Sequence, residues 1–108
     1  MRKLPRVCLA ASLLAVVVPG WPRPVAEIEA GRRAFMAAGC YQCHGTIGQG
    51  GVGPRLAPAP LPVEAMTAFV RYAARNMPAY SPQVLSDADL RLIHGYLDSI
   101  KDPPPPGP

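Results

Sequence analysis

No stretch of the 108-residue chain alternates apolar and polar side chains over the length of a β-strand, which leaves little basis for a sheet. Apolar residues instead recur at helical spacing in three segments, and this pattern predicts helices over residues 27–39, 63–75 and 86–100. Gly39 is placed to end the first helix, and Ser86 is placed to cap the last. The sequence therefore predicts an all-α fold of three to four helices.

The chain also lacks an excess of charge beyond its first 26 residues. Residues 1–26 carry four bases and no acids, whereas residues 27–108 carry seven bases and seven acids. The formal net charge of +4 therefore describes the N-terminal segment alone. A near-neutral domain offers no clustered basic face for nucleic acid, and it argues against long-range steering towards a highly charged partner.

No apolar run is long enough for a comfortable membrane-spanning helix, which needs roughly 20 residues. The apolar run Val7–Val18 follows the basic head MRKLPR, and this layout is typical of a secretory signal. Small residues fit a cleavage site loosely after Gly20 or after Ala26. We expect residues 1–26 to be a signal peptide or an uncleaved N-terminal anchor, and the protein to be periplasmic.

Cysteine is scarce, and so are the other residues that bind metals. Cys8 lies in the apolar leader, which leaves Cys40 and Cys43 for the exported domain. A zinc site needs four ligands, and the two histidines, His44 and the distant His94, do not complete one nearby. A thioredoxin-like dithiol needs a βαβ context, and no strand is predicted near the cysteines.

The stretch CYQCH, residues 40–44, matches C-x-x-C-H, the attachment signature of c-type haem. Two thiols one short turn apart can each form a thioether with a haem vinyl group, and the next imidazole can then ligate the iron. The motif therefore predicts thioethers at Cys40 and Cys43 and a proximal iron ligand at His44. One covalent haem would also stabilise a domain of about 82 residues, which has little core of its own.

The sixth iron position needs a ligand from elsewhere in the chain. Met66 has helical spacing and is interpreted as a core residue, and Met36 precedes the motif. Met77 lies in an irregular segment and is followed by Pro78, so it can be presented to the opposite haem face. We predict Met77 as the distal ligand, with His94 as the less favoured alternative. Methionine with histidine suits electron transfer, whereas an open position suits ligand binding or peroxide chemistry.

The loop over residues 45–62 contains glycines that match the dinucleotide pattern G-x-G-x-x-G. That motif should follow a strand and open a helix, and here it follows CYQCH and leads into prolines. We interpret the match as fortuitous. The glycines are expected to let the loop pass close to a flat macrocycle. Loops this long are unusual in a small domain unless they wrap a cofactor.

Several motifs together resemble the class I cytochromes c, in their short bacterial monohaem form, over residues 27–100. They are G-x-x-x-F at Gly31 and Phe35, CYQCHG, GPRL from Gly53, NMPAY from Asn76, and the final segment LSDADLRLIHGYLDSI. The resemblance implies that the first and last helices cross at near right angles, with Gly31 and Phe35 against Tyr96 or Leu97.

The resemblance also implies that the Pro54 carbonyl accepts the Nδ1 proton of His44, and it agrees with Met77 as distal ligand. The interval between His44 and Met77 is short for the family, which leaves the haem propionates without an assigned partner. Their candidate partners are three arginines: Arg55, Arg71 and Arg75.

These expectations define a cytochrome c domain over residues 27–101 and a flexible Pro-rich tail over residues 102–108. The expected function is one-electron transfer by an exported monohaem protein that is not itself an enzyme. Its partners would be redox proteins, such as a dehydrogenase or a terminal oxidase or reductase. It would be a monomer or one subunit of a hetero-complex. The alternatives are a haem subunit of a periplasmic dehydrogenase and a ligand-binding or peroxidatic haem protein.

Overall fold

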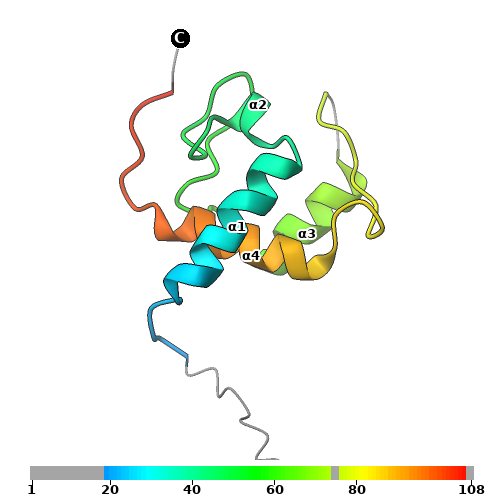
Figure 1. The fold of residues 1–108 in the computed structure, drawn as a ribbon. Helices are drawn as coiled ribbons and strands as arrows, with labels where there is room; N and C mark the ends of the chain where they lie inside the picture. The colour runs from blue at the N-terminus through cyan, green and yellow to red at the C-terminus, as the bar shows by residue number, and fades with distance from the viewer. Residues whose placement is uncertain (1–18, 74–75, 107–108) are drawn as a thin grey trace, which may run out of the picture.

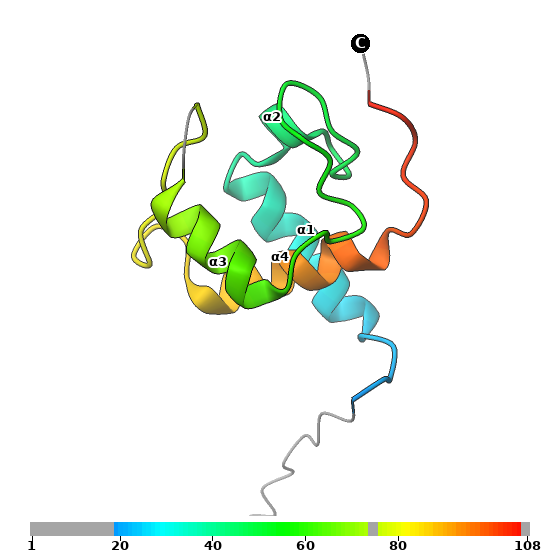
Figure 2. The same ribbon diagram turned by 180° about the vertical axis from the view of Figure 1, so that it is seen from behind.

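A computed structural model describes residues 19–73 and 76–106 of the chain. Four helices follow one another along the sequence, and the described residues contain no strand (Figures 1 and 2). They are α1 (Val25–Ala37), α2 (Tyr41–His44), α3 (Val63–Tyr72) and α4 (Asp87–Ser99). The all-α prediction is confirmed. Cys8, the apolar leader and Arg75 lie outside the described residues.

Helices α1 and α4 cross at the centre of the molecule (Figure 1). A Cβ atom on Gly31 would lie 2.8 Å from the Cβ of Tyr96 and would collide with the backbone carbonyl of Leu92. One turn further along α1, the rings of Phe35 and Tyr96 pack with centroids 5.7 Å apart. The helix contact that the resemblance implied is therefore present, and Gly31 permits it because the two backbones meet there.

Helix α1 begins and ends two residues before the predicted 27–39. Its C-terminal end forms a Schellman motif, in which the amides of Gly39 and Cys40 donate to the carbonyls of Met36 and Phe35. Gly39 adopts φ +78°, which favours glycine. The prediction that Gly39 ends the helix is confirmed, and this turn places Cys40 directly beside the end of α1.

Helix α3 ends at Tyr72 rather than at residue 75, so the predicted helix was three residues too long. Ala73 already has an extended ψ of 135°, and the carbonyl of Val70 accepts the amide of Tyr80. Val70 is the buried residue of α3, which packs against α4. No helix in the described part of the chain is long and apolar enough to cross a membrane.

Helix α4 starts as predicted, because the Ser86 side chain caps it by accepting the amide of Asp89 at 3.0 Å. Its buried face contributes half of the eight buried hydrophobic residues of the core: Leu90, Ile93, Tyr96 and Leu97. The chain then turns back, and residues 101–106 lie beside the 45–62 loop (Figures 1 and 2). The side chain of Pro106 lies next to Gly50 in that loop.

Candidate functional site

The C-x-x-C-H motif forms a single helical turn, α2, with Cys40 at its N-cap. The amide of His44 donates to the Cys40 carbonyl at 3.0 Å, which closes the turn. Cys40 is half-buried, Cys43 is exposed, and neither forms a disulfide. Burial raises the pKa of the Cys40 thiol, whereas reactive dithiols have a lowered pKa. The Cys40 thiol therefore lacks the lowered pKa of a reactive dithiol.

The glycines of the following loop bind the carbonyl end of α2. The amide of Gly53 donates to the Cys43 carbonyl at 2.7 Å, and the amide of Gly50 donates to the His44 carbonyl at 2.8 Å. A Cβ atom on Gly53 would lie 2.9 Å from the His44 ring. These glycines thus allow close approach to the motif itself, whereas the sequence had suggested approach to a macrocycle.

His44 is buried, with 8% of its surface exposed. Its Nδ1 lies 2.7 Å from the carbonyl oxygen of Pro54, and this is the hydrogen bond that the resemblance implied. A carbonyl oxygen only accepts, so Nδ1 carries the proton and donates it. In the neutral ring Nε2 then keeps the lone pair that a metal ligand needs, and the bond fixes the ring orientation.

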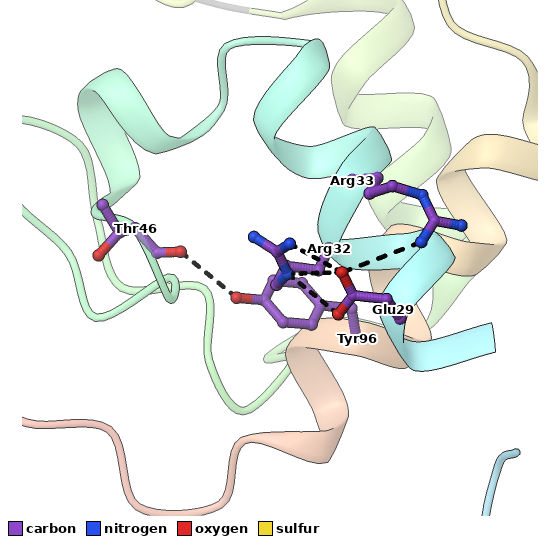
Figure 3. Close-up of polar contacts among 5 residues, drawn as sticks. All are labelled: Glu29, Arg32, Arg33, Thr46 and Tyr96. Carbon is purple, nitrogen blue, oxygen red and sulfur yellow. Dashed lines mark hydrogen bonds and ion pairs between the residues drawn. The ribbon is translucent and has the colours of Figure 1, made fainter. Parts of the chain in front are cut away.

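The start of the 45–62 loop is attached to α4 (Figure 3). The Tyr96 hydroxyl donates to the Thr46 carbonyl at 3.3 Å, and burial raises the pKa of Tyr96, which keeps the hydroxyl protonated. Arg32 lies beside the Tyr96 ring and is held by Glu29 at 2.7 Å (Figure 3). The segment that follows His44 is therefore fixed to the same helix pair that forms the core.

Apolar side chains on and after α3 are only partly covered by the protein. Met66 and Met77 are half-buried against the core cluster, and Phe69 is 52% exposed. Met66, which the sequence predicted to be a core residue, is thus only half-buried and packs against the core cluster in the same way as Met77. With a fixed imidazole and two unpaired thiols, these half-covered apolar residues fit a flat, apolar, covalently attached haem.

Tyr80, three residues after Met77, bonds the Met77 segment to the end of α1. The Tyr80 hydroxyl donates to the carbonyl of Ala38 at 2.7 Å, two residues before Cys40. The Tyr80 amide donates to Val70 at 3.0 Å. The sequence reasoning did not assign Tyr80 a role. Its spacing from Met77 in NMPAY is the signal that could have drawn attention to it.

The arginines proposed for the propionates are otherwise engaged where they are described. Arg71 donates to the Tyr80 carbonyl at 3.0 Å and to Asp87 at 2.5 Å. Arg55 donates to the Pro104 carbonyl at 3.4 Å. The propionate hypothesis is thus not supported for Arg71, whose charge is neutralised within the protein.

A metal cluster and ligation by His94 were the two alternatives for this site. No group of three or more metal-binding side chains (His, Cys, Asp or Glu) occurs within residues 19–73 and 76–106. The Nε2 atom of His94 lies 2.8 Å from the Leu61 carbonyl, so this ring links α4 to the loop before α3.

A surface cavity of about 510 Å³ lies between α1 and residues 80–92 and does not include the motif.

One family model matches the chain, over residues 26–97, and its description is cytochrome c oxidase, cbb3-type, subunit III. The match covers more than half of the chain and includes the haem-attachment motif, Pro54 and Met77. No curated protein and no solved structure matches the chain.

Proposed function

Because the chain belongs to the family of cytochrome c oxidase, cbb3-type, subunit III, a c-type cytochrome family, we propose that it is an exported monohaem electron carrier with His44 and Met77 as axial ligands. The observation that carries the proposal is the buried His44 ring, whose Nδ1 is bound to Pro54 at 2.7 Å. That contact fixes the ring and leaves Nε2 available as an iron ligand.

Each residue of the site has a distinct part in this proposal. Cys40 and Cys43 hold the cofactor as thioethers, and the glycine loop fixes their turn. When bound, haem supplies an iron that gains and loses one electron. Hydrogen bonding to Pro54 makes the His44 ring a stronger donor, and a Met77 thioether on the other side raises the reduction potential.

The same proposal holds that the protein is exported and that it carries electrons without catalysing a reaction itself. The position of Arg23 bears on where a signal peptide would be cleaved. Arg23 packs on Gly95 of α4, with its Nε atom 2.7 Å from the position of a Cβ there. Cleavage after Ala26 would remove Arg23 and the first two residues of α1, whereas cleavage after Gly20 would keep them. The structure therefore favours the earlier cut if the leader is removed.

The family description supports an oxidase as the partner, with this chain as a haem-carrying subunit that passes electrons to it. A near-neutral domain suits a dedicated, close-fitting partner better than one found by long-range charge. A dehydrogenase would serve equally as the electron donor, and peroxidatic chemistry becomes the better proposal if Met77 does not occupy the sixth position.

Replacement of Met77 by alanine tests the proposal in the haem-loaded protein. We expect the spectrum of the oxidised haem to change and the reduction potential to fall, because the thioether ligand is lost. Met36→Ala is the matched control, since Met36 is a half-buried methionine of α1 that packs against the core. An unchanged spectrum and potential in Met77→Ala would remove Met77 as the ligand. Mass spectrometry after denaturation tests the covalent attachment at Cys40 and Cys43.

A further inference from the structure

Tyr80 makes three hydrogen bonds that join separate parts of the chain. Its hydroxyl donates to the Ala38 carbonyl at 2.7 Å, its amide donates to Val70 at 3.0 Å, and its own carbonyl accepts from Arg71 at 3.0 Å. The hydroxyl bond spans 42 positions in the sequence and reaches the C-terminal end of α1. Tyr80 therefore fixes the segment that begins at Met77 to α1 and α3 at once.

The Ala38 contact lies beside the haem-attachment turn. Burial raises the pKa of the Tyr80 hydroxyl. The hydroxyl is thus protonated near neutral pH and can donate. It donates to a carbonyl at the C-terminal end of α1, where no further backbone amide of the helix is available as a donor. One side chain thereby connects the segment of the distal methionine with the turn of the proximal histidine.

Arg71 forms the other part of this connection. Its side chain is only 12% exposed, and it donates to Asp87 at 2.5 Å as well as to the Tyr80 carbonyl. A hydrogen bond from a charged donor is stronger than a neutral one. Because Asp87 is the first residue of α4, Arg71 links α3, the Tyr80 segment and α4.

Met77 is three residues before Tyr80, and the intervening Pro78 restricts the backbone between them. If the sixth ligand were held by its iron bond alone, an outside ligand would need to displace only that bond. A segment held by Tyr80 and Arg71 is different, because Met77 cannot swing far from the iron until those contacts break.

We propose that Tyr80 and Arg71 are positioning residues that keep Met77 on the haem iron and so limit the access of outside ligands to the sixth position. The proposal rests on the proposed His44 and Met77 ligation. It assigns the tyrosine of NMPAY and the arginine of α3 to selection of electron transfer over ligand binding. Both residues would act through Met77 and would not touch the iron.

Imidazole binding to the oxidised, haem-loaded protein tests the proposal, because imidazole competes with Met77 for the iron. Tyr80→Phe removes one hydrogen bond and keeps the ring. A net loss of about 1 kcal/mol corresponds to roughly a fivefold increase in imidazole affinity. Tyr72→Phe is the matched control, since Tyr72 is 85% exposed at the end of α3. It should leave the affinity unchanged.

Arg71→Gln is the second variant, with exposed Arg91→Gln as its control for the loss of one positive charge. We expect about a tenfold or greater increase in affinity for Arg71→Gln, because it leaves the Tyr80 carbonyl without its charged donor. Hydrogen exchange of the backbone amide at position 80 should also be faster in Tyr80→Phe and in Arg71→Gln. That second readout follows release of the segment directly.

The outcomes separate this proposal from the proposed function. If Met77→Ala leaves imidazole affinity unchanged, Met77 is not the ligand and the proposed ligation fails. If Met77→Ala raises the affinity but Tyr80→Phe behaves like Tyr72→Phe, the ligation stands and the positioning role of Tyr80 is overturned. If Arg71→Gln does not fold, Tyr80→Phe alone decides.

Discussion

Two helical glycines allow a sharp test of the α1–α4 crossing, since alanine should be destabilising at Gly31 but not at Gly95. A Cβ atom at Gly31 would meet the backbone carbonyl of Leu92, whose carbon lies 2.7 Å away, and the Cβ of Tyr96 at 2.8 Å. The three atoms nearest to a Cβ atom at Gly95 all belong to the side chain of Arg23, at 2.7–2.9 Å. The first neighbours are fixed in α4, whereas the second is a flexible and half-exposed side chain.

The expected free-energy changes follow from that difference. Carbon atoms pack at about 3.5–4.0 Å, so Gly31→Ala must separate the helices by roughly 1 Å at their closest point. Overpacking of this kind costs up to about 3 kcal/mol, and the better helix propensity of alanine returns about 1 kcal/mol. We expect Gly31→Ala to lower the free energy of unfolding by about 2 kcal/mol.

For Gly95→Ala the gain of about 1 kcal/mol in propensity remains. The added methyl group would displace Arg23 and so weaken its ion pair with Glu27. That ion pair is exposed and contributes only a few tenths of a kcal/mol. We therefore expect Gly95→Ala to be neutral or slightly stabilising. Urea unfolding of the two haem-loaded variants, followed by circular dichroism, measures the difference. Equal stability of Gly31→Ala and Gly95→Ala would show that the backbones do not meet at Gly31, and the reasoning would be refuted.

Two further predictions concern pH and the cofactor. The pKa of Tyr96 is raised in the folded state, so its hydrogen bond to Thr46 contributes fully below the unfolded pKa of about 10 and is lost as pH rises through the folded pKa. Tyr96→Phe should therefore cost about 0.5 kcal/mol at pH 7, and the cost should shrink in strongly alkaline urea titrations; a cost independent of pH would contradict this. A chain with Cys40→Ala and Cys43→Ala, which cannot attach haem, should be largely unfolded by circular dichroism, because few large side chains are fully buried without it. A cooperative melt of that chain would count against the prediction.

The parts of the site that could be predicted from the sequence depend on neighbours in the sequence. The C-x-x-C-H turn, the Ser86 cap and the end of α1 at Gly39 each arise within a few residues. The ends of helices are harder to predict from the sequence, because tertiary contacts determine them. Thus α3 ends at Tyr72, where the chain returns and Tyr80 donates to Val70.

The roles that were missed depend on burial and on distant partners. A sequence shows that Arg71 is charged, and a charge in a haem protein suggests a propionate partner. It does not show that the side chain is 12% exposed and already paired with Asp87. Similarly, the sequence places Gly53 near the motif but does not reveal that its amide donates to Cys43. Such contacts follow from the path of the whole loop.

The C-terminal end of α1 supports both segments that are proposed to carry the iron ligands. Its Schellman turn leads directly into Cys40 and hence into His44, and the Ala38 carbonyl accepts the Tyr80 hydroxyl that holds the Met77 segment. The relative position of the two segments therefore depends on the last turn of α1. If His44 and Met77 ligate the iron as proposed, a change that frays this turn should disturb both ligands together, whereas a change at Arg71 acts first on the Met77 segment. Under the proposed ligation, the helix crossing would matter for the iron ligands as well as for stability, because it fixes α1 against α4, where Asp87 holds Arg71.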